Sequence, residues 1–353
     1  YARAEGVDLA RTAYLGNAVN DLAARYFHKV LLDSSKAAGA RGYVASREIS
    51  PELVELFGLG YAQGEWDALS LFLRTRGFSE GELVQAGVSL KKKSGSGLID
   101  RFRDRLMIPL RDHHGNTVGF TGRVLPATDS TTQQPNDVSA PKYMNSPETP
   151  IYHKGSILFG LDLAKGAIRE AGCVVIVEGN LDVVASHKGG VKQVVASSGT
   201  ALTQDQLTRL KRYTQTVVFC FDADAAGFAA AKKGIGLART LGLDVRAAIL
   251  PDDVKDPDEL VQKDIAARQA CVHASVPIMQ FMIAVVTRGR DLRQIDDKRA
   301  VAKELLPELS LMPSVVEREH WIQVVADLLS PPADQLRSSI SSPASAQLKS
   351  KPA

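Results

Sequence analysis

The sequence predicts a protein of the α/β and α+β classes with an N-terminal mixed α/β subdomain, a central parallel-sheet domain and a C-terminal helical bundle. Two patterns lead to this prediction. Between residues 172 and 250, short apolar runs typical of strands alternate with helical runs, as in βαβ units. After about residue 279 the apolar spacing is helical throughout. The chain has 353 residues, 44% of them hydrophobic, so it is long enough for two or three domains.

The predicted parts follow one another along the chain. The expected ranges are 1–155 for a basic N-terminal subdomain, 156–278 for the central domain, 279–330 for the bundle and 331–353 for a disordered linker. The linker is predicted because this last stretch is rich in Ser, Pro and Ala and has almost nothing to bury.

The N-terminal part begins with a helical pattern over residues 17–45, followed by shorter amphipathic segments. LMIPL (106–110) and TVGFTGRVL (117–125) are strand-like and flank the turn-forming DHHGN, which predicts a β-hairpin. The polar stretch 126–142 contains three prolines and is expected to form a mobile loop.

The central part contains the strand-like runs CVVIV, KQVVA, TVVFCF and VRAAIL, with helix-like runs between them. This alternation predicts parallel strands joined by right-handed crossovers. The carboxyl ends of parallel strands meet at one edge of a sheet, where open α/β sheets bind their ligands.

Acidic residues follow three of these strands at that edge. The six carboxylates are Glu178 and Asp182, Asp222 and Asp224, and Asp256 and Asp258. Two such charges about 4 Å apart repel by roughly 4 kcal/mol at an effective dielectric constant near 20, so a bound cation is favoured. The turns offer only oxygen ligands, which select Mg²⁺ or Mn²⁺ over zinc. Such a cluster commonly serves phosphoryl or nucleotidyl transfer.

A structural role is the alternative for each acid taken singly, because aspartates often cap helix N-termini. Asp182 and Asp258 in particular could simply cap the helices that follow. Three acidic turns at successive strand ends favour a shared metal site over three unrelated caps.

Basic residues are concentrated between residues 91 and 123, where eight Lys and Arg stand against three acids. RFRDR alternates, so that on a strand Arg101, Arg103 and Arg105 would share one face and could follow a phosphate backbone. Arg111 and Arg123 extend this basic segment as further candidates for template contact. A solvated strand face is the alternative interpretation.

The segment 141–155 precedes the acidic domain and offers Lys142, Asn145 and Lys154 as candidates for nucleotide phosphates. The nearby His153 is assigned a structural or surface role.

Composition excludes several other classes of site. The three cysteines are never spaced as CxxC, so neither a zinc site nor a disulfide framework is expected. No apolar run approaches the roughly 18 residues needed to span a bilayer, and we expect a fragment of a cytoplasmic protein with no membrane contact.

An ordered set of motifs over residues 20–330 resembles the RNA polymerase core of bacterial replicative primases of the DnaG type, which contains a TOPRIM domain. The motifs are RFRDRLMIPLRD, VGFTGRVL, PKYMNSPETPIYHKG, LFGL, VIVEGNLDVV, VVASSGTALT, FDADAAG and KDPDEL. The resemblance implies synthesis of short RNA primers on a single-stranded DNA template from ribonucleoside triphosphates (NTPs) with Mg²⁺.

The resemblance also implies roles for single residues. Metal ligands would be Glu178, Asp222, Asp224 and Asp256, with Asp182 and Asp258 as supporting acids. Arg101 and Arg103 match template contacts, and Lys154, with Lys142 and Asn145 beside it, lies where nucleotides and guanosine alarmones bind in this family. Asn180, Leu181 and Ala225 depart from the residues that are frequent at these positions.

Two further modules of the family are not expected in this chain. These are the zinc-binding module, so that no zinc would be bound, and the C-terminal domain that binds the replicative helicase.

Two other classes share part of this pattern. Another TOPRIM enzyme, a nuclease or topoisomerase fragment, would cut DNA without NTPs. A non-catalytic module that binds single strands or alarmones would bind DNA equally well in EDTA and tolerate loss of the acids.

Overall fold

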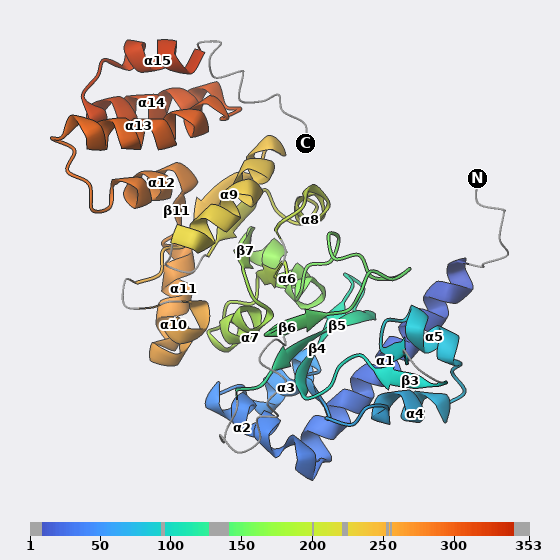
Figure 1. The fold of residues 1–353 in the computed structure, drawn as a ribbon. Coiled ribbons are helices and arrows are strands. Elements are labelled where there is room, and N and C mark those ends of the chain that lie inside the picture. Colours follow the sequence, from blue (N-terminus) through green and yellow to red (C-terminus); the bar gives the residue numbers. More distant parts are fainter. Residues whose placement is uncertain are drawn as a thin grey trace.

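A computed structural model describes residues 9–92, 96–126, 141–199, 201–220, 225–251, 254 and 256–341 (Figure 1). The loop expected at 126–142 therefore lies almost wholly outside the described residues, as do Lys93, Asp222 and Asp224. In the view of Figure 1, the first helix and the C-terminal bundle lie at opposite ends, with the two main sheets between them.

The N-terminal part is a four-stranded sheet flanked by helices. Its helices are α1 (Leu9–Asp33), α2 (Ala38–Ser46), α3 (Pro51–Phe57), α4 (Ala68–Arg74) and α5 (Glu80–Gln85). Its strands are β1 (Gly60–Ala62), β2 (Ser89–Lys91), β3 (Leu98–Asp100), β4 (Arg105–Arg111), β5 (Thr117–Val124) and β6 (Tyr143–Asn145). The order β1-β4-β5-β6 is antiparallel throughout, and β2 and β3 pair separately.

The predicted hairpin is confirmed as β4 and β5, with Ile108 opposite Thr121. Pro109 lies inside β4, which is tolerated because β1 pairs only with residues 105–107 and leaves that side of Pro109 unpaired. The three-residue strands of this N-terminal part were not predicted, since three residues are too few to show a period of two.

The prediction that Arg101, Arg103 and Arg105 share one face of a strand is wrong. β4 begins only at Arg105, and Asp104 before it adopts a left-handed backbone with φ of 48°. Phe102 is buried at 1% exposure in the N-terminal core, so the chain turns there instead of running straight.

The central part is the predicted parallel sheet. Its order is β11-β10-β9-β7-β8, and all neighbours are parallel except the edge strand β11. The strands are β7 (Cys173–Val177), β8 (Val194–Ala196), β9 (Thr216–Phe219), β10 (Asp244–Ala247) and β11 (Val276–Pro277). The helices are α6 (Leu161–Ala171), α7 (Asn180–Lys188), α8 (Gln204–Leu210), α9 (Ala225–Thr240), α10 (Pro257–Lys263) and α11 (Ile265–His273).

Both faces of this sheet are buried, as parallel strands require. Val174 and Ile176 point to one core, and Val175 and Val177 point to a second core on the other face. The second core includes Leu106 and other residues of the N-terminal sheet, so one continuous apolar interface holds the two sheets together.

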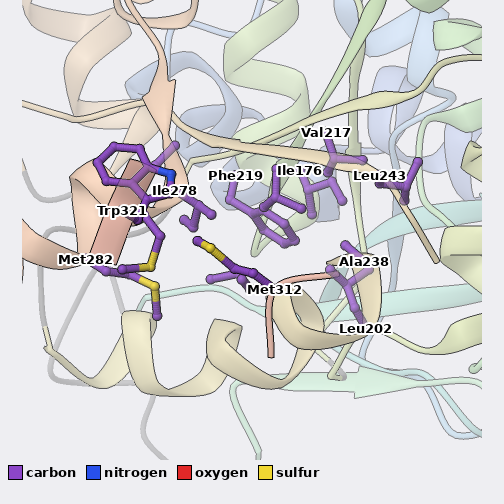
Figure 2. Packing of buried hydrophobic residues seen from close by; sticks show 14 of the residues in the cluster. Ile176, Leu202, Val217, Phe219, Ala238, Leu243, Ile278, Met282, Met312 and Trp321 are labelled. Atoms are coloured by element: carbon purple, nitrogen blue, oxygen red, sulfur yellow. The ribbon is translucent and has the colours of Figure 1, made fainter. Parts of the chain in front are cut away.

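The C-terminal bundle packs on the first core. It comprises α12 (Ile278–Thr287), α13 (Ile295–Ser310), α14 (Val315–Leu329) and α15 (Ala333–Ser341). Figure 2 shows this contact, in which Ile278, Met282, Met312 and Trp321 of the C-terminal region meet Ile176, Val217 and Phe219 of the sheet.

The expectation of a disordered linker from residue 331 is wrong for residues 333–341, which form α15. Leu336 is buried at 7% exposure in the first core, and Arg337 pairs with Glu319 of α14 at 2.7 Å. A single apolar anchor such as Leu336 is hard to detect in a polar stretch.

None of the helices in the described residues has the length and the apolar character needed to span a membrane.

Candidate active site

The connections of the parallel sheet reverse direction beside β7. From β7 the chain crosses to β8 on one side and then returns to β9 on the other. In open α/β sheets this switch point opens a crevice at the carboxyl ends of the two strands. Glu178 directly follows β7, and Asp222 and Asp224 follow β9 in the sequence, although they lie outside the described residues.

A cavity of about 460 Å³ lies at this position, lined by residues of both sheets. On the parallel-sheet side it is lined by three acids, which we call the acidic edge: Glu178, Asp182 and Asp256. On the N-terminal side it is lined by three cations, which we call the basic wall: Arg47, Arg123 and Lys142. Separate segments predicted for metal and nucleotide thus line one cavity.

Two acids of this edge also hold the helices on which they lie. An oxygen of Asp182 accepts a hydrogen bond from the backbone N of Gly179 at 2.8 Å, at the start of α7. Asp256 is the N-cap of α10 and accepts from the backbone N of Glu259 at 2.8 Å. These caps fix the carboxylates on the cavity lining, so capping and a role in the site are compatible.

Asp258 lies behind the cavity. It is buried at 6% exposure, pairs with the guanidinium of Arg47 and accepts from Nε2 of Gln262 at 3.2 Å. Through this pair Asp258 holds a cation of the basic wall in place.

Cations and aromatic rings alternate along the basic wall. The guanidinium carbons of Arg47 and Arg123 lie 5.4 and 5.2 Å from the ring centre of Tyr43, and Arg123 also lies 5.2 Å from that of Tyr143. Arg123 donates a hydrogen bond to the hydroxyl of Tyr143. Burial raises the pKa of both tyrosines above the ordinary value, so the rings stay neutral beside the arginines.

Polar side chains bridge the two sheets across the cavity. Thr121 donates to Oδ1 of Asn145, whose Nδ2 donates to the carbonyl oxygen of Ser198 at 3.3 Å. The hydroxyl of Ser198 donates to Oδ1 of Asn180 at 2.7 Å. Ser198 has a φ of 58°, a left-handed conformation that is costly for serine and is common where a site must be shaped closely.

A second surface leads from the N-terminal part to the cavity. Trp66 is 62% exposed, and the guanidinium carbon of Arg103 lies 4.4 Å from its ring centre. Arg103 is held by the carbonyl oxygen of Asp100 at 2.5 Å. Arg101 donates to the carbonyl oxygen of the cavity residue Asn145 at 3.4 Å. We call Trp66, Arg103 and Arg101 the tryptophan–arginine surface.

Sequence reasoning missed Arg47, Tyr43 and Trp66, and it placed other arginines in the wrong setting. Arg105 is buried at 5% exposure and donates to the carbonyl oxygens of Gly122 and Pro141 at 3.2 and 3.0 Å, which makes it a structural residue.

Two more of the predicted cations lie away from the cavity lining. Arg111 pairs with Asp162 at 3.7 Å and donates to the carbonyl oxygen of Leu56. The backbone N of Lys154 donates to a carboxylate oxygen of Glu148 at 3.0 Å, and Lys154 is not among the lining residues.

The donor set of the acidic edge suits a hard divalent ion. Within the described ranges, no group of three or more His, Cys, Asp or Glu residues is close enough together to hold a metal. Glu178 and Asp256 nevertheless line the same cavity and offer only oxygen atoms, as Mg²⁺ and Mn²⁺ prefer.

Fold and site together define an α/β protein of the Toprim class, with a second, antiparallel sheet that supplies cations to the acidic edge. Family models agree. "DNA primase catalytic core, N-terminal domain" matches residues 26–165, and "Toprim-like" matches residues 175–261.

Solved structures extend the similarity over most of the chain. The RNA polymerase domain of Mycobacterium tuberculosis primase DnaG, in complex with double-stranded DNA, is 33% identical with a TM-score of 0.77, covering 90% of this chain and 98% of that chain. A DnaG primase catalytic domain bound to single-stranded DNA is 33% identical with a TM-score of 0.74, covering 92% of this chain and 99% of that chain. This chain therefore belongs to the bacterial DnaG primase family and corresponds to its catalytic core.

Curated relatives are longer. The DNA primase of Clostridium acetobutylicum is 38% identical over 317 residues, which are 88% of this chain and 49% of that protein. The DNA primase of Halalkalibacterium halodurans is 33% identical over 321 residues, which are 90% of this chain and 52% of that protein. The chain thus spans about half the length of these relatives.

One expectation about domain content is wrong. A model described as "DnaB-helicase binding domain of primase" matches residues 279–330, so an element of this description is present in the chain. The sequence pattern shows only that these residues are helical, and helical spacing does not distinguish a bundle that supports the sheet from one that also binds a partner.

Proposed function

We propose that this chain is the catalytic core of a DNA primase. It would synthesise short RNA primers on single-stranded DNA from NTPs by metal-dependent nucleotidyl transfer. One observation carries the proposal: the acidic edge and the basic wall line the same cavity, at the carboxyl end of the parallel sheet.

The charges on the two sides suit a nucleoside triphosphate and its metal. Arg47, Arg123 and Lys142 would bind the phosphates, since arginine and lysine are the preferred partners of such oxygens. A cavity of about 460 Å³ is within the usual range for a ligand of this size. Stacking of Arg47 and Arg123 on Tyr43 keeps both guanidinium groups in place before the nucleotide binds.

We propose Glu178, Asp222, Asp224 and Asp256 as metal ligands, with Mg²⁺ as the resident ion and no zinc. Bound Mg²⁺ would activate the attacking hydroxyl and neutralise the departing pyrophosphate. Asp182 and Asp258 would act indirectly, the first by fixing the start of α7 and the second by holding Arg47.

The tryptophan–arginine surface is our candidate for the template. Arg101 and Arg103 would contact backbone phosphates, and the exposed ring of Trp66 offers a face for a base. The contact between Arg101 and Asn145 connects this surface to the nucleotide cavity, as templated synthesis requires. The sequence-based roles for Arg105, Arg111 and Lys154 gain no support from their surroundings.

Two regulatory partners are also proposed. The replicative helicase would bind through the bundle at 279–330, whose family model carries that description. A guanosine alarmone would compete with NTPs, because its phosphates and purine could use the same basic wall. Asn145, which borders that wall, would contact the nucleotide.

A direct test is primer synthesis on single-stranded DNA with Mg²⁺ and all four NTPs. We expect short RNA from the wild-type chain and none from the double variant Asp222→Ala, Asp224→Ala, whose circular dichroism should match wild type. The matched control is Asp205→Ala, an exposed acid in the first turn of α8, which should keep full activity. Cleavage of DNA without NTPs would instead identify a Toprim nuclease.

A further inference from the structure

One arginine of the central domain is completely buried close to the acidic edge. Arg268, on α11, is 0% exposed. Its Nε and Nη2 donate to the hydroxyl oxygen of Ser186 at 3.3 and 3.0 Å, and its Nη1 donates to the sulfur of Cys220 at 3.3 Å. Within the described part of the chain, no Asp or Glu forms an ion pair with this guanidinium.

The partners of Arg268 place its charge beneath the switch point of the sheet. Ser186 lies on α7, one helical turn after Asp182. Cys220 follows β9 and donates through its backbone N to the carbonyl oxygen of Ile176 in β7 at 2.9 Å. Cys220 also precedes the proposed ligand Asp222 by two residues in the sequence. The cation thus lies beside the ends of β7 and β9.

The fold leaves room for this long side chain. A Cβ atom at Gly189 would lie 3.0 Å from Cγ of Arg268 and 3.0 Å from Cγ2 of Val261. Gly189 has a φ of −75°, which any residue can adopt. A glycine is therefore needed here for the space that it leaves and not for its backbone conformation. The arginine is therefore built into the junction of α7, α10 and α11.

A guanidinium stays charged even when buried, and burying it on neutral partners is strongly unfavourable unless opposite charge lies nearby. Asp182, one helical turn before Ser186, and Glu178, which directly follows β7, can supply that charge. We propose that Arg268 is an internal counter-cation. Its positive charge balances these acids when no metal is bound, and it repels a divalent metal ion that binds to them. Arg268 is then a positioning residue, and this inference rests on the proposed function.

The test is Mn²⁺ affinity of the whole chain at pH 8.0, measured by electron paramagnetic resonance of free Mn²⁺. Neutral Arg268→Met and Arg268→Gln should bind Mn²⁺ on the order of tenfold more tightly, because a repelling charge is gone. Arg268→Lys keeps the charge and should stay within about twofold of wild type. A purely structural arginine would give unchanged or weaker binding in the neutral variants, and that result overturns the proposal.

Thermal unfolding gives a second readout. Without a counter-cation, the neutral variants should be less stable in EDTA and gain more from Mn²⁺ than wild type does, since tighter binding stabilises the folded state. The matched control is Arg239→Met, a buried arginine that pairs with Glu308 against the bundle. It should lose stability and show the wild-type gain on adding Mn²⁺.

Each outcome has one meaning. Neutral variants that fold only with Mn²⁺ support the proposal, whereas variants that stay unfolded at saturating Mn²⁺ show a structural role and refute it. If the wild-type chain binds no Mn²⁺ and makes no RNA, the proposed function fails. If it does both while the variants bind Mn²⁺ as it does, only this inference fails.

Discussion

Arg105 and Arg103 are two residues apart, and the structure predicts opposite consequences of removing their side chains. The sequence pattern gives both a template role, but Arg105 is 5% exposed and donates to two backbone carbonyl oxygens. Arg103 is half-buried over the exposed ring of Trp66. Arg105→Met should therefore act on stability, and Arg103→Met should act on binding of single-stranded DNA.

The magnitudes follow from these interactions. Each hydrogen bond from a charged donor contributes about 1.5–3 kcal/mol, and methionine retains part of the packing of the arginine stem. We expect Arg105→Met to lower the free energy of unfolding by about 3 kcal/mol. Arg103→Met loses one such bond, at a half-buried site where water can replace the donor, and should cost only about 1 kcal/mol. For a single strand, removing one cation that binds a phosphate reduces the slope of log K against log salt by about 0.7.

The assay combines urea unfolding, followed by circular dichroism, with fluorescence anisotropy of a labelled oligonucleotide over a series of KCl concentrations. Arg103→Met should reduce the salt slope by about 0.7, and Arg105→Met should leave it unchanged. The reasoning is refuted if Arg105→Met reduces the slope as much as Arg103→Met while unfolding at the wild-type urea concentration.

Three further predictions concern the core, the basic wall and the template surface. Burial lowers the pKa of His187 from 6.5 to about 4, so between these pH values the unfolded chain binds a proton that the buried imidazole of the folded chain does not bind. The free energy of unfolding should therefore fall by about 3 kcal/mol as pH drops from 6.5 to 4. His187→Phe keeps the ring contact with Phe57 and should remove this loss in urea titrations; an equal loss in both proteins would contradict it. Asp258→Asn leaves Arg47 beside a neutral amide and should lower the free energy of unfolding by about 2 kcal/mol. It should also weaken NTP binding in a nucleotide titration, and unaltered NTP affinity would exclude the proposed role of Asp258 in holding Arg47. Trp66→Ala should weaken binding of single-stranded DNA by about 1–3 kcal/mol at an unchanged salt slope in the same anisotropy assay, and wild-type affinity would rule out stacking.

The acidic edge was predictable because it depends on local patterns and one rule of topology. Strand-like runs such as CVVIV mark where each strand ends, and parallel strands bring those ends to one edge. Glu178 and Asp256 could therefore be assigned to one edge of the sheet, and both line the same cavity although they are 78 residues apart in the sequence.

The basic wall was only partly predictable. Lys142 and Arg123 belong to motifs, but Arg47 and Tyr43 lie at the end of a helix about 130 residues before Glu178, and their place in the site depends on how two sheets pack. Nothing in the local sequence marks them. The RFRDR pattern misled because period-two alternation over five residues does not ensure a strand, and Asp104 takes a left-handed backbone.

A crystal structure of this chain with Mn²⁺ and an NTP, with the metal located by anomalous scattering, would show directly whether metal and nucleotide share one site. We predict Mn²⁺ beside Glu178 and Asp256 and triphosphate oxygens against Arg47 and Arg123. Metal bound elsewhere, or phosphates that leave the basic wall untouched at millimolar NTP and Mn²⁺, would contradict a shared metal and nucleotide site.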